Sequence, residues 1–371
     1  MSRIKITTLT PVHVGSGNIL QYNSDFITVE DLTCKEKFIQ IIDDKKILDI
    51  IGNENIENWL YSIEHKEDTM SFIKRVAPES NITDYSKRRM HCFARNIKDE
   101  YLKECIHNGF GLPYIPGSSI KGAIRTAVMS SLVGNIEKLE KKTNVRGKIT
   151  ASAIEKEMFG DSPNTDYFKF IKVGDAYFNK ETEIVIRMVM YLNINKSNYL
   201  HPTKNNKPQL AEAIGVDETS EFELKIDKTK YNFSIGKDDT IHTMPIEVSS
   251  ISNLFMLINS HTRNLVSEDI RFWEEMEQTH TGADSYLTAM EDILESINSC
   301  NEGEECILRL GYGSGWRFIT GAWSEVVENF NLIKNASRHK NYLYEEYDFP
   351  KSRRADENGN LMGFVKLSVI S

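Results

Sequence analysis

The sequence predicts an α+β protein made of one or two ferredoxin-like (RRM-like) βαββαβ units with helical insertions. Apolar and polar residues alternate, as in strands, at both ends of the chain and in its middle, and helical spacing lies between. A strand followed by a glycine-rich turn recurs loosely, without a fixed period. Because 371 residues exceed a comfortable single core, we expect two domains, 1–165 and 166–371.

The first domain is expected to open with a strand that runs into a glycine turn over 5–15, followed by half-buried strands over 25–31 and 37–43. A helical insertion is expected over about 45–110, where apolar residues recur every three or four positions. The residues of this pattern include Trp59, Leu60, Ile63, Met90, Phe93 and Ile97.

The end of the first domain predicts one further helix. Residues 113–116 begin and end with proline and predict a short extended segment. Ser118 and Ser119 stand where an N-cap is expected, ahead of a helix over 120–133. The polar residues 134–150 carry both charges and predict an exposed loop.

The second domain is expected to resemble the first. Alternation predicts strands over 168–178, 183–194, 221–226 and 361–370. Helical patterns over roughly 246–278 and 283–298 predict an insertion at about 245–300. A polar connection is expected over 195–208, a glycine-rich loop over 311–315 and a basic turn over 350–354.

The composition is that of an ordinary globular protein, with 40% apolar and 27% charged residues. No stretch approaches the roughly 18 apolar residues of a membrane span, and the first residues have no apolar signal core. We therefore expect a cytoplasmic protein that does not enter a membrane. The five cysteines are scattered and form no CxxC pair, which argues against a disulfide framework or a zinc site. We expect no metal and no cofactor.

The net charge of −9 seems unfavourable for nucleic acid, but it does not say where the charges lie. Four segments contain no Asp or Glu, although 54 acidic residues occur in the chain, and they hold seven Lys or Arg. These segments are 11–20, 113–126, 306–321 and 349–355. This distribution is typical of an acidic protein that keeps one surface free for an anion.

The segment PYIPGSSIKGAIRTAV carries the most specific motif. A helix that starts near Ser119 offers unpaired backbone N–H groups to an anion, and the Ser118 and Ser119 hydroxyls add donors. Lys121 and Arg125 lie four apart on one helix face, and Gly122 leaves room for close approach. The alternative is an exposed helix start with ordinary basic residues. A Walker A site is excluded because no Gly-Lys-Ser/Thr follows.

The segment GYGSGWRF offers a second candidate contact. Gly311, Gly313 and Gly315 allow sharp turns that present N–H groups to phosphate, while Arg317 adds charge and Tyr312 or Trp316 offers a stacking surface. A nicotinamide site is rejected, because Trp316 stands at the third glycine position of that fingerprint. The alternative is a tight turn with Trp316 in the core.

The segment PVHVGSG supplies His13, Gly15 and Gly17 as further candidates. Histidine acts as a general acid or base near neutral pH, so metal-independent RNA cleavage by His13 is an alternative role. A lone histidine is more often structural, and the spacing fixes no second catalytic group beside it.

Two basic runs are ambiguous. Lys351, Arg353 and Arg354 form a basic turn that either contacts phosphate or stays solvated. The run Lys87, Arg88, Arg89 and Arg95 is expected on a helix and is equally open. The RNP1 aromatic pattern is missing, so we do not expect bases to stack on a β-sheet.

Five blocks, LTPVHVGSG, LPYIPGSSIKGAIRTA, FGD with FKFIKVGDA, RLGYGSGW, and PKSRR with MGFVKLSV, resemble the RAMP superfamily of CRISPR proteins. Together they resemble in particular the subunit that caps the guide-RNA 3′ end in type III-A (Csm) effector complexes. They run in family order from 7 to 369, although 45–110 and 200–300 carry little signal. The resemblance departs at GYGSGW, which is shorter in glycine than the longest loops of the family.

The resemblance implies a non-catalytic subunit of ferredoxin-like fold in a ribonucleoprotein of antiviral defence. Such a subunit stacks on the repeated backbone RAMP subunit beside the small helical subunit, holds the 3′ part of the guide RNA (crRNA), and aids its maturation through host ribonucleases. Contact with target RNA is left open. Two alternatives remain, namely a metal-independent repeat-RNA endoribonuclease using His13 or His91, and a capping subunit that contacts only protein.

Overall fold

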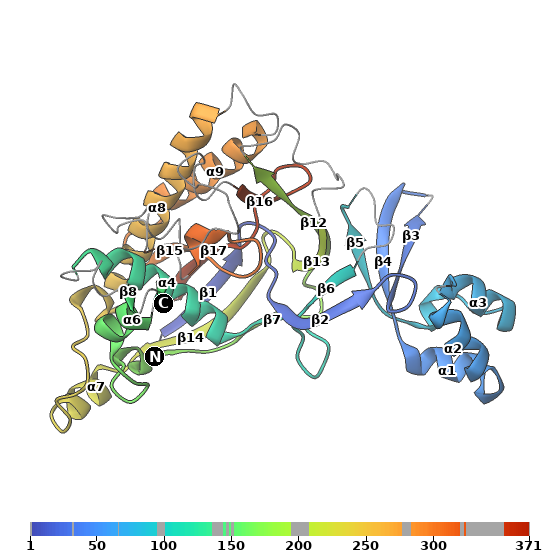
Figure 1. Ribbon diagram of the computed structural model, residues 1–371, viewed down its shortest axis with the longest axis horizontal. Coiled ribbons are helices and arrows are strands. Elements are labelled where there is room, and N and C mark those ends of the chain that lie inside the picture. The colour runs from blue at the N-terminus through green and yellow to red at the C-terminus, as the bar shows by residue number, and fades with distance from the viewer. Residues whose placement is uncertain are drawn as a thin grey trace.

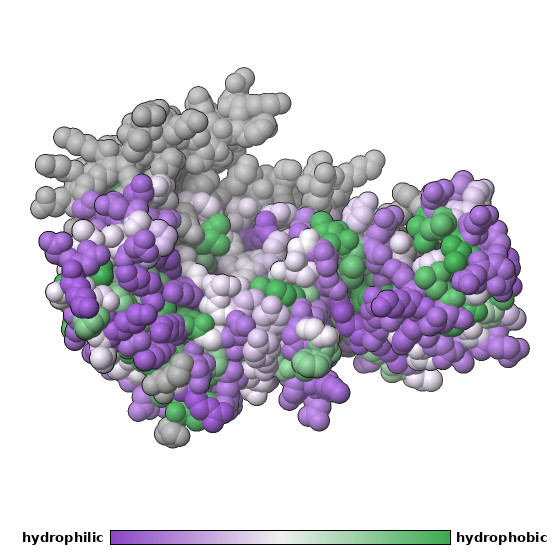
Figure 2. Space-filling model, turned by 90° about the horizontal axis from the view of Figure 1, so that it is seen from below, coloured by the Kyte–Doolittle hydropathy of each residue, from purple (hydrophilic) through white to green (hydrophobic). Residues whose placement is uncertain are grey.

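The computed structural model is an elongated α+β molecule with two main β-sheets (Figure 1). Both chain ends lie at one sheet, and a group of three small helices lies at the far end of the other (Figure 1). The described residues are 2–31, 33–65, 67–94, 101–135, 144–145, 148–149, 152–193, 208–276, 283–319, 323 and 352–370. Seen from below, hydrophilic residues dominate both ends, although an apolar patch lies at the right-hand end, and many paler, more weakly polar residues lie between the ends (Figure 2).

The first sheet is antiparallel, with the strand order β10-β14-β1-β17-β15. Its strands are β1 (Ser2–Thr8), β10 (Ile171–Val173), β14 (Thr219–Ile226), β15 (Glu305–Arg309) and β17 (Phe364–Ile370). Two helices, α4 (Gly117–Leu132) and α8 (Ile251–Met276), complete the chain order β1-α4-β10-β14-α8-β17. This order is a βαββαβ unit with β15 added at one edge, so the predicted fold class is confirmed.

One face of this sheet carries the largest core. Side chains alternate along a strand, so Ile4 and Ile6 point to the helices while Arg3 and Lys5 point to the other face. Helix α8 also protects the free edge of β15, where the Asn259 side chain donates to the carbonyl of Glu305 and accepts from the N–H of Ile307. Helix α9 (Ala283–Asn298) packs against α8.

The second sheet has the order β2-β6-β13-β12-β5-β4-β3, with β16 paired to β12. Its strands are β2 (Gly15–Gln21), β3 (Phe26–Asp31), β4 (Glu36–Ile42), β5 (Ser86–Cys92), β6 (Tyr101–Cys105), β12 (Ile184–Asn193), β13 (Gln209–Ile214) and β16 (Ser352–Asp356). A bridge between Tyr22 and Phe26 links the two outermost strands, and the apolar side chains of one face form a core of their own. The sheet therefore curls around that face.

The remaining elements are short. They are α1 (Asp44–Ile51), α2 (Ile56–Glu64), α3 (Thr69–Val76), α6 (Ser152–Phe159), α7 (Lys228–Ile235), β7 (Tyr114–Ile115), β8 (Asn144–Val145), β9 (Lys148–Ile149) and β11 (Ala176–Tyr177). Each main sheet takes strands from both sides of residue 165, so the sheets do not divide the chain there. The two-domain division stays a prediction. No helix in the described ranges is both long and apolar enough to cross a membrane.

The expected helical insertion is helical only in its first half, over α1 to α3. The second half forms β5 and β6, and Met90 lies on β5 with its side chain in the core of the curled sheet. The prediction was wrong because Met90 and Cys92 alternate as inward residues of a strand, and the helical spacing to Phe93 is coincidental. The expected basic turn over 350–354 is likewise replaced, from Ser352 on, by strand β16. Ile97 and the connection 195–207 lie outside the described residues.

Helix α4 begins at Gly117, three residues before the expected start at 120. Its N-cap is Pro116, so Ser118 and Ser119 lie in the first turn and do not cap it. The early start depends on Gly117, since a Cβ there would overlap the carbonyl oxygen of Val173. Gly122, one turn further on, has no atom within 4 Å of the position of such a Cβ.

We predict opposite effects for alanine at these two glycines. Gly117→Ala should lower the free energy of unfolding by about 1–3 kcal/mol, because the methyl group forces α4 away from β10. Gly122→Ala, the matched control, should raise it by about 0.5–1 kcal/mol, because the site is open and alanine favours the helix. Urea unfolding measures both. Equal effects of the two variants would contradict the tight contact at Gly117.

Candidate nucleic-acid interface

The turn after β1 places His13 between the two sheets. His13 is 3% exposed, and its Nδ1 donates to the carbonyl oxygen of Glu212 on β13 at 2.6 Å. Its own carbonyl oxygen accepts from the backbone N–H of Tyr312 at 2.9 Å. The neighbouring Val12 forms a bridge with Ile214. This His13 junction therefore joins β1, β13 and the 311–315 turn.

The three glycines of the 311–315 turn have φ angles of 79°, 90° and 79°, in the left-handed region that favours glycine. A Cβ on Gly311 would overlap the carbonyl oxygen of His13, and one on Gly313 would lie 3.1 Å from Cβ of Met362. Gly315 has no atom within 4 Å of such a Cβ. Packing therefore requires glycine at 311, the positive φ and a tight contact favour it at 313, and only Gly315 faces open space.

Arg309, a buried residue that the sequence analysis did not single out, holds the 311–315 turn in place. Arg309 is 4% exposed, and its Nε and Nη2 donate to the carbonyls of Met362 at 3.0 Å and Gly313 at 3.3 Å. Its guanidinium also lies 4.5 Å from the ring centre of Phe364. These contacts fix the turn, so it is preorganised before any ligand binds.

Gly15 and Gly17 lie beside the junction. A Cβ on Gly15 would come 3.1 Å from Nε2 of His13, whereas Gly17, with φ of 94°, has open space at that position. Gly17 thus resembles Gly315, because both have a positive φ angle and neither has a neighbouring atom where a Cβ would lie.

His13 is poorly placed for acid–base catalysis. Burial lowers its pKa, so the ring is neutral near pH 7, and the Nδ1 proton is directed to a carbonyl that only accepts. A general base must reach the substrate, and a ring that is 3% exposed does not. The other candidate, His91, packs between Phe38 and Phe93, with ring centres 5.4 and 4.2 Å away.

The basic run at 87–89 lies on strand β5, not on a helix as expected. Alternation turns Arg88 inward, where its Nη2 lies 2.5 Å from Oε1 of Glu212 and 3.1 Å from Oε1 of Glu104. Arg89 points outward and pairs with Asp31 at 3.2 Å. Arg95 lies outside the described residues. Arg88 is thus a structural cation that ties β5 to β6 and β13.

The N-terminus of α4 already holds a carboxylate. Oδ1 of Asp175 accepts from the N–H of Gly117 at 2.7 Å, so a protein side chain occupies part of the expected anion site. Arg125 pairs with Asp166 at 2.8 Å and stacks over the ring of Phe159 at 3.6 Å. Lys121, whose Nζ lies 5.7 Å from the ring centre of Phe168, makes no salt bridge with any residue in the described ranges.

Two of the expected RNA-binding arginines are engaged with one buried carboxylate. Arg353 contacts Asp269 of α8 at 2.6 Å and is 6% exposed. Arg317 lies 3.4 Å from the same Asp269, whose other oxygen accepts from the hydroxyl of Tyr286 at 2.8 Å. Burial is the largest influence on Asp269 and disfavours its charge, but Arg353, Arg317 and the Tyr286 hydroxyl together outweigh it and lower the pKa of Asp269. Arg353 therefore holds α8 to strand β16, and Arg317 holds α8 to the segment that follows the 311–315 turn.

Arg354 points to the opposite face of β16. Its guanidinium lies 4.8 Å from the ring centre of Tyr312 and 5.2 Å from that of Tyr191. Lys103 approaches the Tyr312 ring as well, at 5.2 Å, and the Tyr312 hydroxyl donates to Gln209. Lys351 lies outside the described residues.

The structure thus brings several predicted residues together. The His13 turn and the 311–315 turn touch through Gly311 and Tyr312. Helix α4 packs against the short helix η7 (Trp316–Phe318) that follows the glycine turn. Arg354 joins this region through Tyr312, while Arg353 faces away into the α8 contact.

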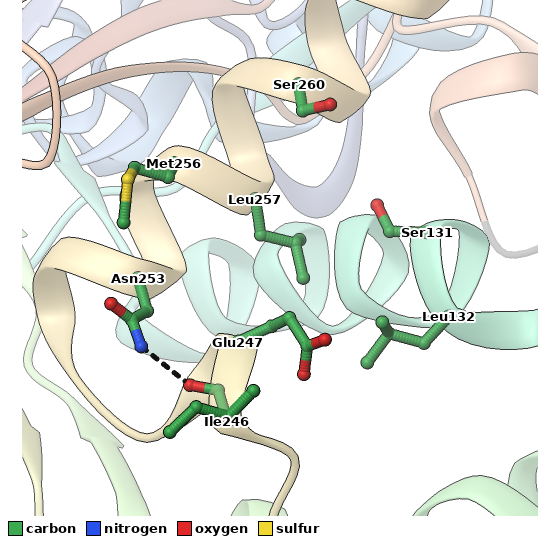
Figure 3. A pocket seen from close by; sticks show the side chains of 8 residues that line it. All are labelled: Ser131, Leu132, Ile246, Glu247, Asn253, Met256, Leu257 and Ser260. Carbon is green, nitrogen blue, oxygen red and sulfur yellow. Dashed lines mark hydrogen bonds between the residues drawn. The ribbon is translucent and has the colours of Figure 1, made fainter.

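A pocket of about 410 Å³ lies at the other end of α4 (Figure 3). It is lined by Ser131, Leu132, Ile246, Glu247, Asn253, Met256, Leu257 and Ser260. Its walls come from α4, α8 and the short helix η5 (Ile246–Val248), and none of the predicted site residues lines it. Among the described residues, no group of three or more His, Cys, Asp or Glu side chains is arranged to hold a metal ion.

Comparison with known proteins adds the following similarities. The model of the RAMP superfamily matches residues 5–318. The chain is 25% identical over 328 residues to the "CRISPR system Cms protein Csm5" of Methanocaldococcus jannaschii, which covers 84% of this chain and 71% of that protein.

Two solved structures share the fold. A chain from the cryo-EM structure of a Csm–crRNA–target RNA ternary complex of a type III-A CRISPR-Cas system matches with a TM-score of 0.74 and 19% identity, over 100% of both chains. The crystal structure of Csm5 from T. onnurineus matches with a TM-score of 0.64 and 20% identity, over 97% of this chain and 99% of that one.

We predict that Asp269→Asn lowers the free energy of unfolding by about 3–5 kcal/mol at neutral pH, because it leaves Arg353 buried without its counter-charge. Glu268→Gln is the control. Its carboxylate lies 3.8 Å from Arg317 but is 46% exposed, so the loss should stay below about 1 kcal/mol.

The same pair gives a pH signature. The folded-state pKa of Asp269 lies below its unfolded value, so its stabilisation is present above about pH 4 and is lost as the pH falls further. Urea unfolding over this range should therefore show a flatter acid limb for Asp269→Asn than for wild type. Identical acid limbs would count against the ion pair.

Proposed function

Because the chain belongs to the RAMP superfamily, whose model matches residues 5–318, we propose that it is a non-catalytic, RNA-binding subunit of a type III-A CRISPR effector ribonucleoprotein. In this proposal it holds the 3′ part of the guide RNA, caps the filament of the repeated backbone subunit beside the small helical subunit, and aids crRNA maturation in antiviral defence. The full-length likeness to a chain of a Csm–crRNA–target RNA complex and to Csm5 structures supports this assignment.

One observation carries the RNA-binding role. The His13 turn and the 311–315 turn, nearly 300 positions apart, meet at the junction, and helix α4 with Lys121 adjoins them through η7. Gly17 and Gly315 expose sharply turned backbone, and a ribose-phosphate chain fits such surfaces without reading bases. Lys121 makes no salt bridge with a described residue, so its charge is available to a phosphate.

Arg317 and Arg353 have a structural role in this proposal, because both pair with Asp269. Each lies within 3.4 Å of Asp269, and releasing either would leave a buried carboxylate undercompensated. Lys121, Gly17, Gly122, Gly315 and Arg354 form the RNA-contacting set instead. Ser118 and Ser119, in the first turn of α4, add hydroxyl donors beside Lys121.

The rival role as an endoribonuclease finds less support. His13 is buried, neutral and bonded through Nδ1 to a carbonyl, so it neither reaches a ribose hydroxyl nor exchanges a proton readily. Processing of guide RNA is therefore assigned to recruited host ribonucleases.

We predict that Lys121→Ala weakens binding of guide-length RNA about equally for unrelated sequences, and reduces the slope of log K against log salt by about 0.7, the share of one phosphate on a single strand. Lys45→Ala, an exposed lysine on α1 far from the junction, is the matched control and should leave the slope unchanged. Fluorescence anisotropy titrations between 50 and 200 mM salt measure both. If both variants keep the wild-type slope, Lys121 contacts no phosphate.

Incubation of the purified chain with repeat RNA in EDTA separates binder from nuclease. The expected result is intact RNA over hours, once any co-purifying host ribonuclease has been removed from the preparation. Site-specific cleavage that disappears in His13→Gln or His91→Ala, while both variants stay folded by circular dichroism, would establish the endoribonuclease and overturn the non-catalytic assignment.

A further inference from the structure

The outer face of the curled sheet carries aromatic rings and cationic side chains next to one another. Neither a hydrophobic core nor an ordinary solvent-exposed surface requires this arrangement. Strand register places the side chains of Phe38, His91, Arg187, Tyr191, Arg354 and Lys103 on one face, opposite the core formed by Ile39, Met90 and Ile186. Arg89 shares this outer face, and Phe93, which follows β5, reaches it too.

Cations and rings alternate across this face at contact distance. Arg89 lies 3.7 Å from the ring centre of Phe38, and Arg187 lies 3.9 Å from that of Phe93. Farther along the sheet, Arg354 lies between two tyrosine rings and Lys103 approaches one of them. We call this set the cation–aromatic strip; it consists of Phe38, Arg89, His91, Phe93, Lys103, Arg187, Tyr191, Tyr312 and Arg354.

The strip is exposed at its Arg89 and Phe93 end, whereas the Arg187 side chain is only 14% exposed, and its charge is positive. The Arg89 side chain is 46% exposed and Phe93 is 38% exposed. Asp31 and Asp356 neutralise Arg89 and Arg187, at 3.2 Å each. Lys103 and Arg354 make no salt bridge with any described residue, so two cations remain uncompensated on a protein whose total charge is −9.

The strip is also continuous with the proposed RNA path. Tyr312 belongs to the 311–315 turn and donates its N–H to His13, while its ring receives Lys103 and Arg354 of the strip. Strand β6, which carries Lys103, pairs with β2 at Gly15. A strand of RNA that leaves the glycine turns therefore meets Tyr312 first and the rest of the strip next.

We propose that the cation–aromatic strip is a second RNA contact, on which unpaired bases of the guide strand stack while Lys103 and Arg354 neutralise its phosphates. The inference rests on the proposed function and extends it from the ribose-phosphate chain to the bases. Aromatic faces accept any base, and cations beside them add attraction, so the contact is tolerant of sequence. The sequence predicted no base stacking on a β-sheet because the RNP1 pattern is missing. The proposal departs from that prediction, since the aromatic residues of the strip follow no RNP1 pattern.

The test is a comparison of two RNAs of equal length and charge, one ordinary and one abasic along its 3′ half. Phe93→Leu keeps an apolar side chain but removes the flat ring. It should weaken binding of the ordinary RNA about tenfold, the effect of losing one stacked base, and change binding of the abasic RNA less than about twofold. Phe93→Trp keeps a ring and should bind the ordinary RNA at least as tightly as wild type.

Tyr61→Leu is the matched control. Tyr61 is an aromatic residue of α2 that is 58% exposed and stacks on His65, so it resembles Phe93 but lies outside the strip. It should leave both affinities unchanged. Thermal unfolding by circular dichroism checks that every variant is folded.

The outcomes separate the two proposals. Suppose that wild type binds both RNAs and that Lys121→Ala lowers the salt slope. If Phe93→Leu then has no effect on RNA affinity, or an equal effect on both RNAs, the strip stacks no base. In that case the inference is overturned while the RNA-binding role stands. If wild type binds neither RNA, the proposed function itself fails. Selective weakening on the ordinary RNA supports the strip.

Discussion

The arrangement of the molecule depends on the backbone of His13. Its carbonyl accepts from Tyr312, its ring donates to Glu212, and the adjacent Pro11 carbonyl accepts from Gly363. Segments from the beginning, middle and end of the chain are thereby fixed at one point between the two sheets. A polar group buried at such a junction must be satisfied. Gly311 and Gly363 beside it are required because a Cβ on either would overlap a backbone carbonyl oxygen.

Burial decides which cations hold the protein together and which can serve a ligand. Arg309 and Arg353 lie inside and Arg88 is partly buried, and each is bound by carboxylates or carbonyls of the protein. Removing one partner of such a group is costly, so these arginines are committed to the fold. Lys103, near the Tyr312 ring, and Lys121, on the helix α4 that packs against η7, have no salt bridge within the described ranges. Such cations are the ones that the fold leaves available to a ligand.

The sequence was sufficient for the elements whose periodicity is unambiguous. The strand near 361–370, the helices near 246–278 and 283–298, and the βαββαβ class are confirmed, whereas the opening strand β1, Ser2–Thr8, covers only the first part of the expected 5–15. Strands β5 and β6 were missed because their inward residues also fit a helical spacing. The carboxylates that occupy the predicted anion-binding groups could not be foreseen from the sequence. Asp269 lies far along the chain from Arg353, and Asp175 lies far from the N–H of Gly117. Only the folded topology brings each pair into contact. The RNA-binding residues as a set remain a prediction.

The most direct test of the central claim is ultraviolet crosslinking of guide RNA within the assembled complex, with crosslinked peptides identified by mass spectrometry. The account predicts that crosslinks fall on peptides containing Tyr312 and Phe93, with α4 peptides around Lys121 as neighbours. Crosslinks confined to α1–α3 or to the polar face of the five-stranded sheet, or the lack of any crosslink on this subunit while other subunits are labelled, would contradict it.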